Sequence, residues 1–172
     1  MLCIILALTL KAVNPGPQDR DADGAGALNP REAGFDVLPP VGSLTLTQAA
    51  DLIAAAPTDK VRLRLFFEFC RGADEAGAAA MALAGCEPPS TGSARFDALL
   101  AAIAEHLASR VGVAAPEWAE GPDRFLTTPW WVSPLPSARA QALRGTPTSF
   151  RRRGIYLDRS DLGQDGVTAL GD

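Results

Sequence analysis

The sequence predicts a mainly α-helical protein: a small helical domain with a proline-rich, irregular C-terminal half and at most one short strand or hairpin. Three observations indicate this class. Apolar residues recur at helical spacing between Phe96 and Leu107. Beyond Gly112, repeated prolines leave room only for short helices and turns. Hydrophobic residues make up 47% of the 172 residues and charged residues 21%, a composition typical of a chain that buries one core.

By composition the chain divides into three parts. Residues 1–43 are expected to be a disordered or mis-started leader, because Pro, Gly and Asp dominate after the apolar run Leu2–Leu10. That run has no preceding positive charge and no cleavage site, and it is shorter than the ~20 residues of a membrane span. We therefore expect neither a signal peptide nor a membrane anchor. Residues 44–163 form the predicted single helical domain, and residues 164–172 a frayed tail.

The N-terminal half of the domain is expected to contain three helices. The first is capped by Thr47 and ends before Pro57. The second begins at Pro57 or Thr58 and continues to about Arg71. The third, over residues 73–84, is rich in alanine and weakened by Gly77. The apolar face of the second helix is expected to contain Val61, Leu63, Leu65, Phe66 and Phe69.

The strongest predicted helix begins after Ser93, its expected N-cap, and contains the periodic apolar residues up to Leu107. Its regular pattern places it at the centre of the core. Short helices are expected over residues 137–143 and 148–153, and residues 155–157 are a candidate strand.

The residues that usually carry chemistry are few and scattered. Cys3, Cys70 and Cys86 are an odd, widely spaced set, which favours reduced thiols and a cytoplasmic protein. The single histidine, His106, and these cysteines do not have the spacing of a zinc site. No glycine-rich phosphate loop or nucleophile elbow is present. We therefore expect a protein that is not an enzyme and has no cofactor or metal.

Two alternatives remain open. A small enzyme would use His106 with Glu117 or Asp123 as acid and base. A DNA-binding regulator would use residues 45–71 as a helix-turn-helix, or the arginines near the C-terminus. Against the regulator, the second helix carries Leu and Phe where polar, base-reading side chains are needed. The net charge of −4 also argues against general affinity for nucleic acid.

The best candidates for function are aromatic and arginine side chains in the C-terminal half. Two adjacent tryptophans are expected to point in different directions, one to the core and one towards the surface, where it could anchor a partner. Arginines bind acidic partners well, although cations in the last turn of a helix also stabilise its dipole. The predicted partner-binding residues are Trp130, Trp131, Arg139, Arg144, Arg151, Arg152 and Arg153.

Several short motifs between residues 87 and 162 carry a resemblance to a known family. They are Pro88-Pro89, Thr91-Gly92, the run from Arg95 to Leu107, Pro116-Glu117-Trp118, Arg124-Phe125-Leu126, the run from Trp130 to Ser137, the run from Phe150 to Ile155, and Asp158 to Leu162. In these motifs the chain resembles a family of small uncharacterised actinobacterial proteins that are associated with genes for toxin-type nucleotidyltransferases.

The resemblance implies a partner role, that of an antitoxin-like or regulatory protein for such a nucleotidyltransferase. It covers somewhat under half of the chain, and residues 44–71 look similar in outline. The leader departs from the pattern. The resemblance transfers no functional residue, so it bears on the partner and leaves the chemistry to the residues themselves.

Overall fold

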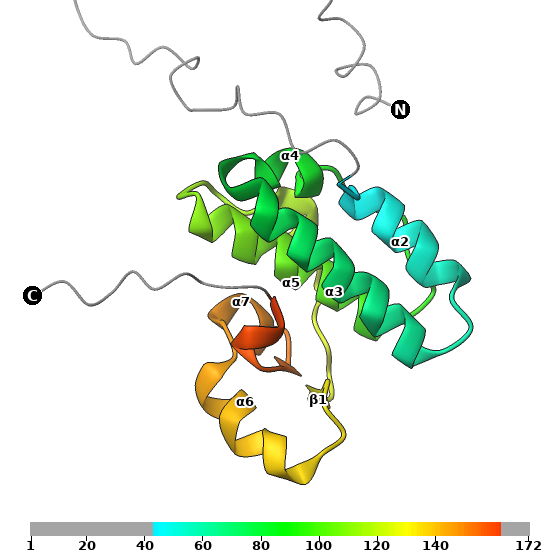
Figure 1. Cartoon of the computed structure of the whole chain (residues 1–172), viewed down its shortest axis with the longest axis vertical. Coiled ribbons are helices and arrows are strands. Elements are labelled where there is room, and N and C mark those ends of the chain that lie inside the picture. The colour runs from blue at the N-terminus through cyan, green and yellow to red at the C-terminus, as the bar shows by residue number, and fades with distance from the viewer. Residues whose placement is uncertain (1–42, 163–172) are drawn as a thin grey trace, which may run out of the picture. The chain divides into compact units, whose positions relative to one another are not determined.

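A computed structural model describes residues 43–162 of the chain. They are mainly helical, as predicted (Figure 1). The predicted leader up to residue 42, including Leu2–Leu10, and the predicted tail lie outside the described residues. The elements, with η for a 3-10 helix, are α2 (Leu46–Ala55), α3 (Asp59–Ala76), η1 (Gly77–Ala79), α4 (Ala80–Ala84), α5 (Ala94–Arg110), η2 (Glu117–Glu120), η3 (Pro122–Arg124), β1 (Trp130–Trp131), η4 (Pro136–Ala138), α6 (Arg139–Gly145), α7 (Thr148–Arg151), β2 (Ile155–Tyr156) and η5 (Arg159–Leu162).

The N-cap of helix α2 lies two residues earlier than predicted, at Thr45. The Thr45 hydroxyl accepts a hydrogen bond from the Gln48 N–H (3.2 Å), and the Gln48 side chain accepts one from the Thr45 N–H (2.9 Å). This reciprocal pair is a capping box. The prediction that Thr47 caps the helix is wrong, because the capping box closes around Thr45 and leaves Thr47 inside the first turn.

The capping box gives a direct test of where α2 begins. The Thr45→Ala variant is expected to lower the free energy of unfolding by about 1 kcal/mol, because the first turn loses the acceptor for one of its free N–H groups. Thr47→Ala is the matched control and should leave stability almost unchanged. Urea unfolding of both variants decides, and a larger loss for Thr47→Ala would contradict the observed cap.

Helix α3 begins after Thr58, as predicted, but it continues beyond Arg71 to Ala76. The break falls at Gly77, whose φ of +53° suits a residue without a side chain. The buried face also differs from the expected one, since Val61 is 39% exposed. The residues of α3 that enter the core are Phe66, Phe69, Cys70, Ala73 and Ala76.

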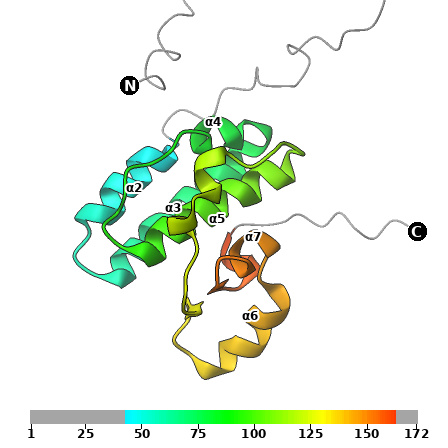
Figure 2. The ribbon, with the colours of Figure 1, turned by 180° about the vertical axis from the view of Figure 1, so that it is seen from behind.

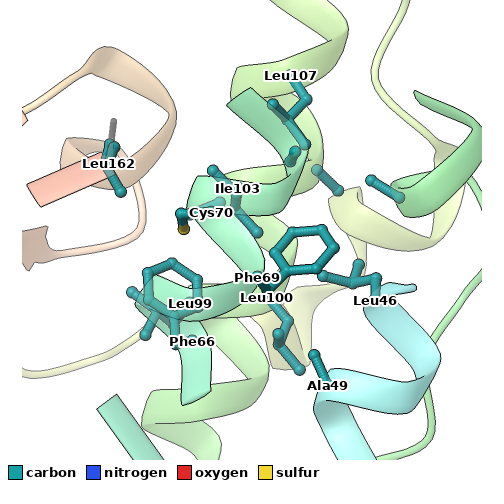
Figure 3. Packing of buried hydrophobic residues seen from close by; sticks show 14 of the residues in the cluster. Leu46, Ala49, Phe66, Phe69, Cys70, Leu99, Leu100, Ile103, Leu107 and Leu162 are labelled. Carbon is teal, nitrogen blue, oxygen red and sulfur yellow. The ribbon is translucent and has the colours of Figure 1, made fainter. Parts of the chain in front are cut away.

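Helix α5 lies at the centre of the core, as predicted. All five of its periodic apolar residues are buried, and they pack against α2, α3 and residues of the C-terminal half (Figure 3). Figure 3 shows Phe66 and Phe69 of α3 next to Leu99 and Leu100 of α5, with Leu46 of α2 beside them. Ser93 occupies the N-cap position, as predicted, but its side chain makes no capping hydrogen bond.

The C-terminal half is irregular, as predicted, and is built from short helices and one pair of strands (Figure 2). Strand β1 pairs with β2 in parallel, with Trp130 opposite Ile155 and Trp131 opposite Tyr156. The sequence predicted at most one short strand or a hairpin. The observed pair is parallel and not a hairpin, because α6 and α7 join the two strands where a hairpin would have a tight turn. Helix α7 contacts α5, which fastens this half to the core.

The cysteines follow the sequence expectation only in part. Cys70 is a free thiol, and its burial raises its pKa well above the usual range. Cys86 is disulfide-bonded, so the expectation of reduced thiols is wrong for this residue. None of the helices in the described part of the chain is long and apolar enough to cross a membrane.

Candidate partner-binding surface

The three consecutive arginines at the end of α7 do not form one exposed patch. Arg153 is completely buried, whereas Arg151 and Arg152 are exposed. The Arg151 guanidinium donates to the carbonyl oxygens of Leu143 (3.2 Å) and Thr146 (3.1 Å). Arg151 therefore binds the end of α6 while part of its side chain stays at the surface.

Arg153 connects three segments of the chain. Its guanidinium pairs with the Glu105 carboxylate of α5 and donates to the carbonyl oxygens of Ser149 (2.9 Å) and Ala119 (2.6 Å). It also lies over the Phe125 ring, 4.8 Å from the centroid. In this conformation Arg153 cannot contact a partner protein, and its interactions instead fix the C-terminal half on α5.

Arg152 strengthens the same connection from the surface. It forms ion pairs with Glu105 (3.0 Å) and with Glu120. Desolvation lowers the pKa of Arg152, but the two carboxylates outweigh it, so the pKa is raised overall. Two of the predicted partner-binding arginines, Arg152 and Arg153, are thus engaged within the domain.

The two tryptophans point away from each other, as expected for adjacent strand residues. Trp130 packs against the core, with its ring edge to face on Phe96 at 5.5 Å between centroids. Trp131 is stacked on Tyr156 of β2 at 4.5 Å, with the planes 19° apart. Both side chains remain partly exposed. The prediction that one tryptophan is buried and the other exposed is therefore too sharp.

Trp131 lies beside a hollow of about 210 Å³ at the end of the strand pair. Arg139, at the start of α6, lines this hollow and places its guanidinium carbon 5.4 Å from the Trp131 centroid. Asp158 and Asp161 form its acidic side. Partial burial, together with the charge of Asp158, raises the pKa of Asp161. The hollow therefore combines an aromatic pair, a cation and two carboxylates.

On its other side Trp131 lines a larger groove of about 740 Å³ between β1 and the first half of α3. The sequence did not single out the α3 residues of this groove. They recur at helical spacing on one face of α3, but this spacing alone does not show that they border a groove with β1, and Leu63 was predicted to face the core. These residues are Lys60, Leu63, Arg64 and Phe67.

The remaining predicted residues lie apart from these features. Arg144 is exposed on α6 and forms no ion pair with other described residues. His106 is half-buried beside the Phe150 ring and lines a hollow of about 440 Å³. Neither Glu117 nor Asp123 lines that hollow.

Among residues 43–162 no group of histidine, cysteine and carboxylate side chains could hold a metal ion. Comparisons with protein-family models, with curated proteins and with solved structures found no match to this chain.

Proposed function

We propose that this protein is a non-enzymatic, cytoplasmic interaction protein that binds a protein partner through the surface around Trp131. The observation that carries the proposal is the Trp131–Tyr156 stack next to Arg139, half-buried between two hollows. Trp, Tyr and Arg are the residues that most often dominate binding energy at protein interfaces, and they do so where they are held rigidly beside a concave surface.

The class of partner follows from the resemblance described above. We propose that the protein acts as an antitoxin-like or regulatory partner of a toxin-type nucleotidyltransferase. On the surface, Arg139, Arg144 and the exposed part of Arg151 are available to such a partner. Arg152 and Arg153 have a positioning role, because they hold the strand pair and its tryptophans on α5.

The test is affinity purification of the tagged full-length chain from its native host, with nuclease treatment and mass spectrometry. A stoichiometric nucleotidyltransferase that is lost with Trp131→Ala would support the proposal. Leu52→Ala is the matched control, because Leu52 is an exposed apolar residue of α2 outside the surface. Arg139→Glu provides a second variant that removes no buried contact.

Three results would overturn the proposal. The first is recovery of the protein alone. The second is a partner whose binding is indifferent to both Trp131→Ala and Arg139→Glu. The third is a complex that disappears on nuclease treatment, which would favour the DNA-binding alternative. Thermal unfolding of each variant separates loss of binding from loss of fold.

A further inference from the structure

Helix α3 carries two apolar stripes, and only one of them is fully buried in the core. The core stripe contains Phe66, Phe69 and Cys70. The second stripe runs along the first half of the helix, where Leu63 and Phe67 are only partly buried and face the groove beside β1. The second stripe therefore contacts the edge of the core and leaves part of its apolar surface exposed at the groove.

The groove is apolar along its walls. Leu63 and Phe67 line one side and Val132 and Pro134 the other, while Val61 lies exposed at the rim. Its volume of about 740 Å³ exceeds that of the hollow beside Arg139. An open apolar patch with a polar rim is typical of a site that binds another protein.

The charges at the rim of this groove are mostly positive and free of acidic partners. Lys60 and Arg64 line the groove, and Arg95 lies 5.8 Å from the Trp130 centroid. Within residues 43–162 none of these three forms an ion pair. The one carboxylate there, Asp59, is paired with Arg62 (3.5 Å).

This local excess of cations is not a property of the whole chain, which has a net charge of −4. Elsewhere, arginines such as Arg71, Arg110 and Arg124 are paired with carboxylates. The groove therefore has a positive rim and an apolar floor. Its electrostatic complement is a segment with acidic edges and large apolar side chains.

We infer that the groove between α3 and β1 receives an acidic, amphipathic segment of the partner protein. The inference rests on the proposed function and specifies the part of the partner that is recognised. Apolar side chains of this segment would fill the space between Phe67 and Val132, and its carboxylates would meet Lys60 and Arg64, as in other grooves that bind amphipathic helices.

A single-stranded nucleic acid would also match the positive charge, but it needs aromatic faces on which bases can stack. Here the Trp131 ring is already stacked on Tyr156, and the Trp130 ring lies against Phe96 with Arg95 over it. The walls contributed by Leu63 and Val132 are aliphatic. These contacts favour a protein segment.

The test uses the full-length chain and two labelled synthetic peptides. Both carry Leu and Phe at i, i+3, i+4 and i+7. One has Glu at the flanking positions and the other Lys. We expect the acidic peptide to bind about tenfold more tightly at low salt. Equal affinity of the two peptides, or tighter binding of the basic one, would overturn the inference.

A double charge reversal then tests the groove itself. Lys60→Glu combined with Arg64→Glu should weaken binding of the acidic peptide about tenfold, because two attractions become repulsions. Folding should be unaffected, because both side chains are exposed and Lys60→Glu places a carboxylate near the positive N-terminal end of α3. Arg71→Glu is the matched control, because Arg71 is exposed on the same helix but outside the groove, and it should leave the affinity unchanged. An unchanged affinity of the double variant would overturn the inference, as would displacement of the peptide by oligo(dT).

The same double variant separates this inference from the proposed function. In the affinity purification, loss of the nucleotidyltransferase with the double variant supports both. A partner that the double variant retains, and that Trp131→Ala loses, overturns the groove inference and leaves the proposed function intact. Absence of any partner from the wild-type purification overturns the proposed function.

Discussion

The Arg153→Ala variant is expected to lose about 3–5 kcal/mol of unfolding free energy, as is usual when one member of a buried ion pair is removed. The change leaves the Glu105 carboxylate, only 16% exposed, without its buried cation. It also removes the donors to the carbonyl oxygens of Ser149 and Ala119. Urea unfolding monitored by tryptophan fluorescence measures the loss.

Two comparisons make this prediction specific to the buried position. Arg152→Ala removes a cation from the same carboxylates, but the Arg152 side chain is 40% exposed, so the expected loss is about 1 kcal/mol or less. In a double-mutant cycle with Glu105→Ala, the effects should be far from additive, because the two side chains interact directly. Equal losses of unfolding free energy for Arg152→Ala and Arg153→Ala would show that Arg153 does not connect the C-terminal half of the domain to α5.

The function of Arg153 could not be predicted from local sequence. Three arginines before a glycine are typical of a solvated helix end, and nothing near them in the chain indicates burial. The partner carboxylate, Glu105, is 48 residues away on another helix. Such a pair appears only when α7 is packed on α5, so the sequence indicated a charged cluster but not which of its members is buried.

Helices with a periodic apolar pattern could be predicted, because that pattern is local in the sequence. The buried face of α5 repeats along the helix, and a long amphipathic pattern determines both the helix and its inward side. Strands of two residues have no period, so the parallel pairing of Trp130–Trp131 with Ile155–Tyr156 left no signal. The groove on α3 was not predicted, because Val61 and Leu63 were assigned to the core face and nothing in the sequence showed that α3 lies beside β1.

The fold and the candidate surface depend on the same contacts. Strand β2 follows closely after Arg153, and among the described residues β1 pairs only with β2. The ion pair of Arg153 with α5 therefore determines where Trp131 is held. Loss of this connection should weaken partner binding as well as stability.

The second large effect is expected at Asp97, in the first turn of α5. Its carboxylate accepts hydrogen bonds from the Ser90 hydroxyl (2.7 Å), the Thr91 N–H (2.7 Å) and the Thr91 hydroxyl (2.6 Å). These bonds fasten the preceding loop to the helix, whereas the sequence predicted only that Ser93 caps it. Asp97→Ala is expected to lower the free energy of unfolding by about 2–3 kcal/mol, because the buried donors of Thr91 lose a charged acceptor.

Two further variants distinguish this carboxylate from an ordinary helix cap. Ser93→Ala should leave the urea midpoint almost unchanged, because the Ser93 side chain makes no capping bond. Asp97→Asn keeps an oxygen for Thr91 but loses the charge, so its cost should be about half that of Asp97→Ala. If Ser93→Ala were the more damaging change, the loop would be held by a conventional cap. The ranking of Asp97→Ala, Asp97→Asn and Ser93→Ala thus shows which side chain anchors the central helix.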